Sequence, residues 1–206
     1  MSAQVVNHPL VDHHLSELRD ISTPSSLFRR SIHRLSCLLA YEATKNLTTR
    51  VHRVQTPLCE TEGKRLDQRI ALVPILRAGL GMVDPILDWI PEAEVWHLGL
   101  YRDESTAQPV EYYNKLPTDH VDDLALILDP MLATGGSAAS ACMALKKWGV
   151  PNIKLLSVIA APEGVAALES DFPELEIFVC SLDERLNDQK FIVPGLGDAG
   201  DRIFHT

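Results

Sequence analysis

Short apolar runs alternate with stretches of helical spacing from residue 70 onward. Five runs have the length and apolar character of strands: 70–76, 94–100, 124–128, 153–160 and 176–180. Three intervening stretches have helical character: 80–89, 137–148 and 162–170. Strands that alternate with helices form a mainly parallel sheet covered on both faces. The pattern therefore predicts an α/β fold.

The first 69 residues carry a different pattern. Residues 1–22 suggest an irregular arm. A helix follows, because the apolar residues Phe28, Ile32, Leu35 and Leu39 repeat at helical spacing. Ser22 or Thr23 is expected to cap this helix, with Pro24 in its first turn.

Two polar segments are expected to lie outside the sheet. Residues 44–69 are rich in Thr, Arg and Glu and predict a β-arm or a loop. Residues 102–120 contain Pro109 and Pro117 and predict a long loop or hairpin.

Composition narrows the class of protein. The chain has 206 residues, of which 46% are hydrophobic, which fits a single domain over 1–206. No apolar run reaches the roughly 18 residues of a membrane span, and no signal peptide is evident, so a cytoplasmic location is expected. The net charge of −9 argues against nucleic-acid binding. The four cysteines form no CxxC pair and predict reduced thiols rather than a zinc site.

One strand leads into a loop of small residues and then into a helix. The segment 124–137 reads LALILDPMLATGGS. The first amides of a helix have no partner within the helix and attract anions, and glycine lets a phosphate approach the backbone closely. Thr134 and Ser137 add hydroxyl donors, and Asp129 can accept hydrogen bonds from ribose hydroxyls. The segment lacks the Gly-Lys-Ser/Thr of a Walker loop.

Arginines and glycines follow two other strands. Arg77 precedes Gly79 and Gly81, and Arg102 follows the run at 94–100. The carboxyl ends of parallel strands meet at one edge of a sheet, where ligands bind. These arginines are therefore expected to face the same anion as the loop after Asp129.

The C-terminal segment 191–202 reads FIVPGLGDAGDR. Gly195, Gly197 and Gly200 formally satisfy the dinucleotide-binding GxGxxG pattern. Only six residues follow Gly200, too few for the helix and strand that this pattern requires. A flexible tail is the simpler alternative, but the apolar residues and the proline oppose it.

These three segments resemble the uracil phosphoribosyltransferases, and the resemblance covers almost the whole chain. The general phosphoribosyltransferase loop carries further acidic residues where this chain has Pro130 and Ala133, and DPMLATGGS is the form of the uracil branch. The C-terminal segment resembles the uracil-binding stretch YIVPGLGDAGDR, with Phe191 in place of Tyr.

The resemblance implies an activity and a set of site residues. Uracil would receive the phosphoribosyl group of phosphoribosyl pyrophosphate (PRPP) at N1, giving UMP and pyrophosphate. Asp198 and Arg102 would be catalytic, and Ile192, Gly197, Asp198 and Ala199 would contact uracil. Mg²⁺ would be held mainly by PRPP. PRPP would contact Arg77, Arg102, Asp129, Pro130, Met131, Leu132, Ala133, Thr134, Gly135, Gly136, Ser137 and Asp198.

The resemblance also implies a fold and partners. The fold would be phosphoribosyltransferase-like, with a β-arm and a small C-terminal hood, formed by about 181–206, over the active site. A homodimer or homotetramer and activation by GTP are family expectations.

Three other functions remain open at this stage. The same fold could serve a regulator that binds RNA, although the negative charge opposes this. A related enzyme could act on hypoxanthine or orotate. An NAD-dependent oxidoreductase is disfavoured because the glycine pattern lies at the end of the chain.

Overall fold

A parallel sheet forms the centre of the molecule. The computed structural model describes residues 3–102, 109–114, 116–117 and 119–206. In this part of the chain the sheet has seven strands in the order β1-β11-β10-β8-β4-β5, with β9 beside the end of β10. The strands are β1 (Gln4–Val5), β4 (Ile70–Pro74), β5 (Glu94–Val95), β8 (Leu124–Leu128), β9 (Met131–Leu132), β10 (Asn152–Ala160) and β11 (Glu176–Leu182).

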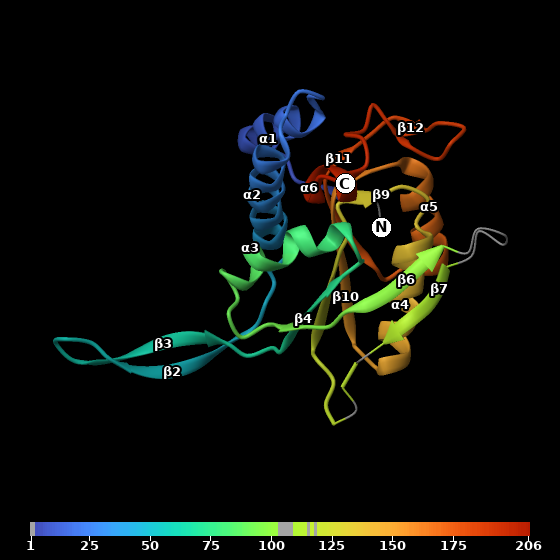
Figure 1. The fold of residues 1–206 in the computed structure, drawn as a ribbon. Helices are drawn as coiled ribbons and strands as arrows, with labels where there is room; N and C mark the ends of the chain where they lie inside the picture. The colour runs from blue at the N-terminus through green and yellow to red at the C-terminus, as the bar shows by residue number, and fades with distance from the viewer. Residues whose placement is uncertain (1–2, 103–108, 115, 118) are drawn as a thin grey trace.

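Helices cover both faces of this sheet (Figure 1). Side chains alternate between two cores, so that Leu126 packs with one set of helices and Ile127 with the other. The first core contains residues of α1 (Pro9–Arg19), α2 (Ser25–Ala43), the 3₁₀ helix η1 (Ala78–Met82), α3 (Val83–Leu87) and α6 (Ala199–Phe204). The second contains residues of α4 (Gly136–Trp148) and α5 (Pro162–Asp171). Among the described residues, no helix is both long and apolar enough to span a bilayer.

The structure corrects the predictions for the N-terminal residues. Residues 1–22 are not an irregular arm, because α1 lies within them. His8 caps α1 through its Nδ1 atom, which accepts from the Leu10 amide at 3.1 Å. The next helix begins at Ser25, and its N-cap is Pro24 rather than Ser22 or Thr23. The Thr23 hydroxyl instead donates to the Glu17 carbonyl oxygen at 2.6 Å.

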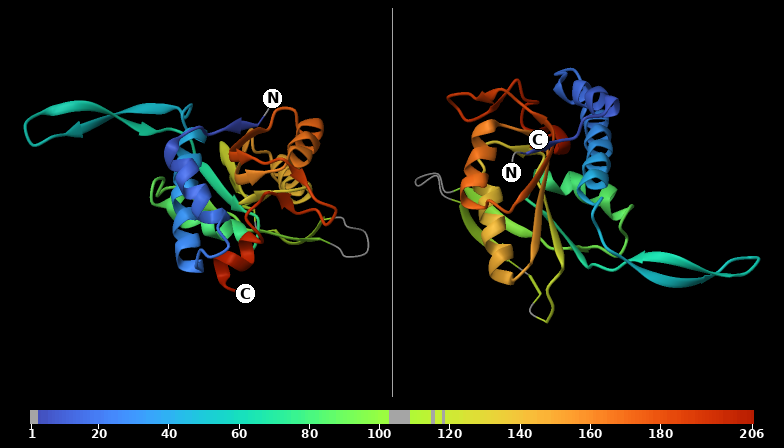
Figure 2. Two further views of the ribbon diagram at one scale, coloured as in Figure 1. Left: turned by 90° about the horizontal axis from the view of Figure 1, so that it is seen from above. Right: turned by 180° about the vertical axis from the view of Figure 1, so that it is seen from behind.

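The predicted β-arm is present, and two other elements differ from expectation. Strands β2 (Thr49–Gln55) and β3 (Glu60–Leu66) form an antiparallel arm that projects from the body of the molecule (Figures 1 and 2). The single strand expected over 94–100 is divided into β5 and β6 (Leu98–Arg102). Strand β6 pairs with β7 (Pro109–Asn114) in a separate antiparallel sheet. In place of the single helix expected over 80–89, the 3₁₀ helix η1 leads directly into the short helix α3 over 78–87.

The C-terminal segment lies beside the ends of the central strands. It contains the paired strands β12 (Arg185–Leu186) and β13 (Ile192–Val193), followed by α6. The Arg202 guanidinium attaches this segment to the helical layer, because it donates to the Leu18, Leu196 and Asp20 carbonyl oxygens. It also lies 4.3 Å from the centre of the Phe28 ring.

A second guanidinium attachment involves a buried carboxylate. Arg19 of α1 donates to both Asp183 oxygens, at 2.8 and 2.6 Å, and to the Gly195 carbonyl oxygen at 2.8 Å. Asp183 also accepts from the Ser181 hydroxyl at 2.7 Å and the Gly195 amide at 3.0 Å. Burial alone would raise the pKa of Asp183, but the hydrogen bonds from Arg19 and Ser181 keep this pKa below its ordinary value. The ionised carboxylate therefore holds the turn at Gly195 against α1.

We predict that Asp183→Asn lowers the free energy of unfolding by about 3 kcal/mol, since it leaves the Arg19 guanidinium without its counter-charge. The folded-state pKa of Asp183 is lowered, so its contribution exists above the unfolded pKa of about 3.9 and disappears as the pH falls through the folded value. Urea unfolding at pH 7 measures the effect. Glu60→Gln, in the exposed pair Arg53–Glu60, is the control and should change stability little. Equal stability of Asp183→Asn and wild type would contradict this role.

Candidate active site

The loop between β8 and α4 forms a small hollow at the carboxyl edge of the sheet. The hollow has a volume of about 80 Å³. Strand β9 holds the loop in place by pairing with the end of β10, where Met131 is opposite Ile159. The residues that line it are Asp129, Met131, Leu132, Ala133, Thr134, Gly135, Gly136, Ser137 and Ala138. Pro130 lies behind them, with its carbonyl oxygen accepting from the Val158 and Ile159 amides.

Free amides are available in this hollow. Helix α4 begins at Gly136, and the Ala139 amide donates to the Gly135 carbonyl oxygen at 2.8 Å. The amides before Ala139 precede the first intrahelical bond. Within the described part of the chain, the Thr134 and Gly135 amides have no acceptor. The hollow therefore presents the positive end of a helix to an anion.

Asp129 lies at the base of the hollow, directly after β8. Its Oδ1 atom accepts from the Met131 amide at 3.3 Å. Asp129 is half-buried, and desolvation by the surrounding protein atoms raises its pKa to about 7, which the Met131 hydrogen bond offsets only in part. The group is therefore partly protonated at neutral pH, and a nearby cation or hydroxyl donors would stabilise its charged form.

The loop after β4 lies against the end of β8. A Cβ atom at position 79 would be 2.3 Å from the Leu128 carbonyl oxygen, so only glycine fits there. This contact brings Arg77 to the same edge of the sheet as Asp129. The Arg77 guanidinium donates to Asp201 at 3.1 Å, and 60% of the Arg77 side chain is exposed. An exposed pair of this kind is weak, so an incoming anion can compete for the guanidinium.

The C-terminal segment meets the same loop. Asp198 is the N-cap of α6, and its Oδ1 atom accepts from the Asp201 amide at 2.9 Å. A Cβ atom at position 200 would lie 3.2 Å from Asp198 Oδ1 and 3.8 Å from Arg77 Nη2. Asp198 and Arg77 are therefore neighbours, although 121 positions separate them. Ile192 and Ala199 are buried, and Gly197 has a φ of +80°.

Helix α5 supports both halves of the site. A Cβ atom at position 164 would lie 2.2 Å from the Ala133 carbonyl oxygen. The start of α5 therefore packs directly against the loop between β8 and α4 (residues 129–135), which we call the phosphate loop. The neighbouring Glu163 side chain accepts from the Leu186 amide at 2.9 Å, which connects α5 to β12.

The structure thus brings most of the predicted site residues to one edge of the sheet. Arg77 and Asp198 are in proximity, and the end of β8 that leads into the phosphate loop adjoins the loop carrying Arg77. Residues 197–199 do not themselves line the 80 Å³ hollow. Arg102 ends β6, but its side chain lies outside the described residues.

Sequence reasoning missed three contributors to this arrangement. Gly164, Asp183 and Asp201 were not among the predicted site residues. The paired spacing of Asp198 and Asp201 at a helix start was the available signal for Asp201, because the first-turn position favours an acidic residue. Asp183 had no such signal, since its partner Arg19 is 164 positions away.

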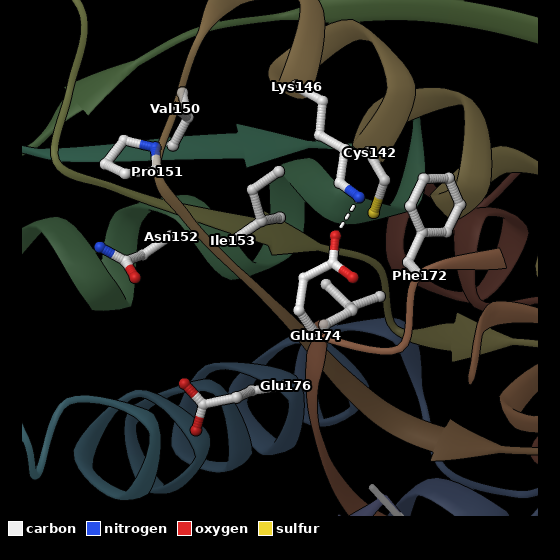
Figure 3. A pocket seen from close by; sticks show the side chains of 10 residues that line it. Cys142, Lys146, Val150, Pro151, Asn152, Ile153, Phe172, Glu174 and Glu176 are labelled. Atoms are coloured by element: carbon white, nitrogen blue, oxygen red, sulfur yellow. Dashed lines mark hydrogen bonds and ion pairs between the residues drawn. The ribbon is translucent and has the colours of Figure 1, made fainter. Parts of the chain in front are cut away.

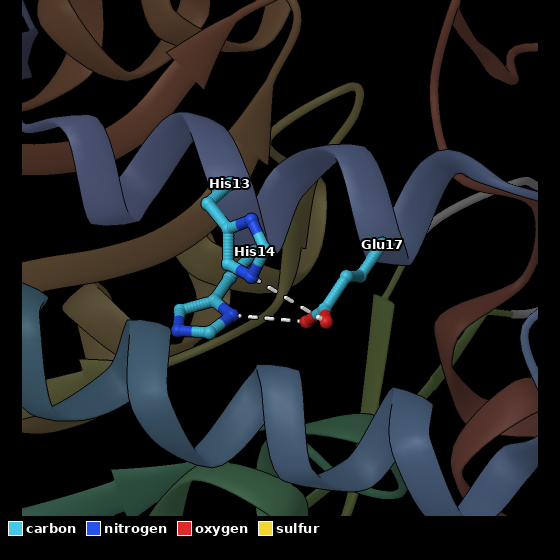
Figure 4. A group of neighbouring side chains, drawn as sticks. All are labelled: His13, His14 and Glu17. Carbon is cyan, nitrogen blue, oxygen red and sulfur yellow. Dashed lines mark hydrogen bonds and ion pairs between the residues drawn. The ribbon is translucent and has the colours of Figure 1, made fainter.

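A cluster of two histidines and a glutamate lies on α1, outside the site residues described above. On α1, Glu17 accepts from His14 at 2.9 Å and from Ser31 at 2.6 Å, and His13 lies beside it (Figure 4). These hydrogen bonds, chiefly from Ser31, lower the pKa of Glu17 and join α1 to α2. Among the described residues, this cluster leaves no buried side-chain oxygen or nitrogen without a partner, so we assign it to helix packing.

A further hollow, of about 130 Å³, lies at the opposite edge of the sheet. Lys146 and Glu174 pair across it, and Cys142 lies beside them (Figure 3). Burial raises the pKa of the Cys142 thiol to about 12, so the thiol is not a nucleophile at neutral pH. Its lining includes the carboxylates of Glu174 and Glu176, but no loop that leads into the first turn of a helix as residues 134–137 do.

Comparison with solved structures identifies the fold. The solved hypoxanthine phosphoribosyltransferase from Staphylococcus aureus superposes with a TM-score of 0.50 over 78% of this chain and 76% of that chain. Its sequence identity is 13%, so the likeness concerns the fold alone. The architecture is therefore that of the phosphoribosyltransferases.

Sequence comparison is more specific. The profile of the family described as uracil phosphoribosyltransferase matches residues 5–206, and this chain belongs to that family. A uracil phosphoribosyltransferase from Roseiflexus sp. (strain RS-1) is 57% identical over 99% of each chain. The solved AQ2163 protein from Aquifex aeolicus is 39% identical, with a TM-score of 0.91 over 97% of this chain and 96% of that chain.

The raised pKa of Asp129 predicts an unusual dependence of stability on pH. The ligand-free fold holds the Asp129 proton up to about pH 7, whereas the unfolded chain releases it near pH 4. The unfolded state is therefore favoured progressively as the pH rises from about 4 to about 7. We expect Asp129→Asn, which has no proton to lose, to gain thermal stability relative to wild type across this range. Melting curves of both proteins from pH 5 to pH 8 measure it, and parallel profiles would contradict the burial of the carboxyl group.

Proposed function

We propose that this protein transfers the 5-phosphoribosyl group of PRPP to N1 of uracil, giving UMP and pyrophosphate. One observation carries the proposal at the level of residues. The loop after β4, which carries Arg77, packs against both the end of β8 and the start of α6. A phosphate site and a base site would thus share one edge of the sheet.

The loop after Asp129 would hold the PRPP 5-phosphate. The unpartnered amides of Thr134 and Gly135, with the Thr134 and Ser137 hydroxyls, supply donors without a net positive charge. Helix α4 adds the favourable end of its dipole. Asp129 would accept hydrogen bonds from the ribose hydroxyls, which keeps the sugar in register with the phosphate.

The backbone around Gly197 would read the pyrimidine edge. An amide can donate to uracil O4, and a carbonyl oxygen can accept from N3–H. Cytosine reverses both groups, so a buried mismatch would cost about 1–3 kcal/mol for each unpaired group. Ile192 and Ala199 are buried and would set the walls of this subsite.

The leaving pyrophosphate would interact with Arg77 and Arg102. When a polyphosphate displaces Asp201 from Arg77, the guanidinium gains a more highly charged partner. Oxygen ligands suit Mg²⁺, which retains several waters and binds substrate phosphates together with one or two carboxylates. Asp129 and Asp198 offer such carboxylates and fit a cation held mainly by PRPP. When bound, Mg²⁺ would neutralise charge on the pyrophosphate.

In the reaction, the bond from C1 to N1 forms as the bond from C1 to the pyrophosphate oxygen breaks. The protein would act mainly by positioning the reactants and stabilising charge. The N1 proton must leave. Asp198 is our candidate to accept this proton, because it lies within the segment 197–199 that we propose contacts uracil.

Two features stay predictions from the family resemblance, namely a homodimeric or homotetrameric assembly and activation by GTP. A cytoplasmic location stays a prediction from the sequence pattern.

The function is tested by mixing the protein with Mg²⁺, PRPP and one labelled base at a time. We expect UMP and pyrophosphate from uracil, and little product from cytosine, hypoxanthine or orotate. Product from another base, with none from uracil, would replace the proposed substrate. RNA retained at physiological salt without any transfer would instead favour a binding protein.

We predict that Asp198→Asn lowers kcat/KM for UMP formation by at least tenfold while the protein stays folded. Asparagine is as good an N-cap as aspartate, so the start of α6 should persist and the melting temperature should change little. The loss would then report the missing charge. Steady-state kinetics with both substrates measure it, with Asp201→Asn as the neighbouring control. Near-normal turnover of Asp198→Asn would remove this carboxylate from the mechanism.

A further inference from the structure

We propose that Glu94, His120 and Asp122 form a binding site for one divalent transition-metal ion of the Zn²⁺ type, remote from the phosphate loop. The three residues each offer one ligand atom, and these atoms all lie within 4.8 Å of one another. The proposal depends on no part of the proposed enzyme activity.

The spacing is close to that of a tetrahedral site. His120 Nε2 and Glu94 Oε2 are 3.0 Å apart. Ligands at the usual zinc distances are separated by roughly 3.4 Å, so small side-chain rotations would admit an ion. One imidazole with two carboxylates is a donor set that zinc accepts, with water completing the coordination.

Asp122 supplies the observation that points to a ligand. Its side chain is fully buried, with 0% of the residue exposed. The Trp96 indole N–H donates to Oδ2 at 3.2 Å, whereas Oδ1 is buried and has no partner among the described residues. A buried carboxylate oxygen without a donor is costly, and a bound cation would satisfy it.

The surrounding groups have the arrangement expected around a metal ligand. The other ring nitrogen of His120, Nδ1, lies 3.0 Å from Asp119 Oδ1. A carboxylate at that position fixes the tautomer that leaves Nε2 free to bind metal. Trp96 orients Asp122 in the same way from the other side.

Charge supports the same conclusion. Three carboxylates, those of Glu94, Asp119 and Asp122, surround a single imidazole. The Arg69 guanidinium also attracts Asp122, but less strongly than His120 does. Protonation of His120 would balance only one of the carboxylates. A divalent cation would balance two, and it would connect the edge strand β5 to the segment that enters β8.

The test is calorimetric titration of the ligand-free protein with Zn²⁺ alone, without PRPP or Mg²⁺. We expect one equivalent to bind, and at least a tenfold loss of affinity in His120→Gln and in Asp122→Asn. The amide oxygen introduced by Asp122→Asn can still accept from the Trp96 indole, so that variant should keep its fold. The control His13→Gln alters the other histidine–carboxylate cluster and should bind Zn²⁺ as the wild type does.

Two further measurements exclude other sites. Co²⁺ should give visible d–d bands without a thiolate charge-transfer band, which separates this site from the exposed thiol of Cys59. Zn²⁺ should raise the melting temperature of the wild type but not of His120→Gln. Unchanged affinity in His120→Gln, loss of binding in His13→Gln, or wild-type binding weaker than about 1 mM would each overturn the proposal.

Discussion

Close backbone packing at the carboxyl edge of the sheet is the constraint on which the candidate site depends. Position 79 touches the Leu128 carbonyl and position 164 touches the Ala133 carbonyl, and neither contact leaves room for a Cβ atom. These contacts set the distance between the loop after β4, the loop after β8 and the start of α5. A wider spacing would separate Arg77 from the phosphate loop. Two glycines distant in sequence therefore define the geometry of one site.

A site built this way relies on backbone groups more than on charged side chains. The described amides of Thr134 and Gly135 offer donors to an anion, although the protein as a whole carries a net charge of −9. Local dipoles dominate at hydrogen-bonding distance, whereas the net charge acts over longer range and is screened by salt. The acidic surface and an anionic substrate are therefore compatible.

Local patterns predicted much of the fold but few of its long-range contacts. The strand at 124–128 was predicted correctly because it is a continuous apolar run. The helix ending at Gly149 was predicted because it has helical periodicity and a glycine stop signal. The irregular-arm prediction for 1–22 was wrong, since polar histidines obscured the helical spacing of α1. The site motifs identified candidate residues, yet the Arg19–Asp183 pair has no local signature. Such contacts arise only when the sheet brings distant segments together.

The contacts of Arg202 determine which helices the C-terminal segment would follow if they moved. Its guanidinium joins the C-terminal segment to carbonyl groups of α1 and to the loop after it, and it stacks on Phe28 of α2. The phosphate loop, by contrast, is anchored to β10 and α5. The two parts of the site thus have different main supports, although the hydrogen bond from the Leu186 amide to Glu163 also links the C-terminal segment to α5. A shift of α1 and α2 relative to the sheet would therefore displace the C-terminal segment more than the loop between β8 and α4.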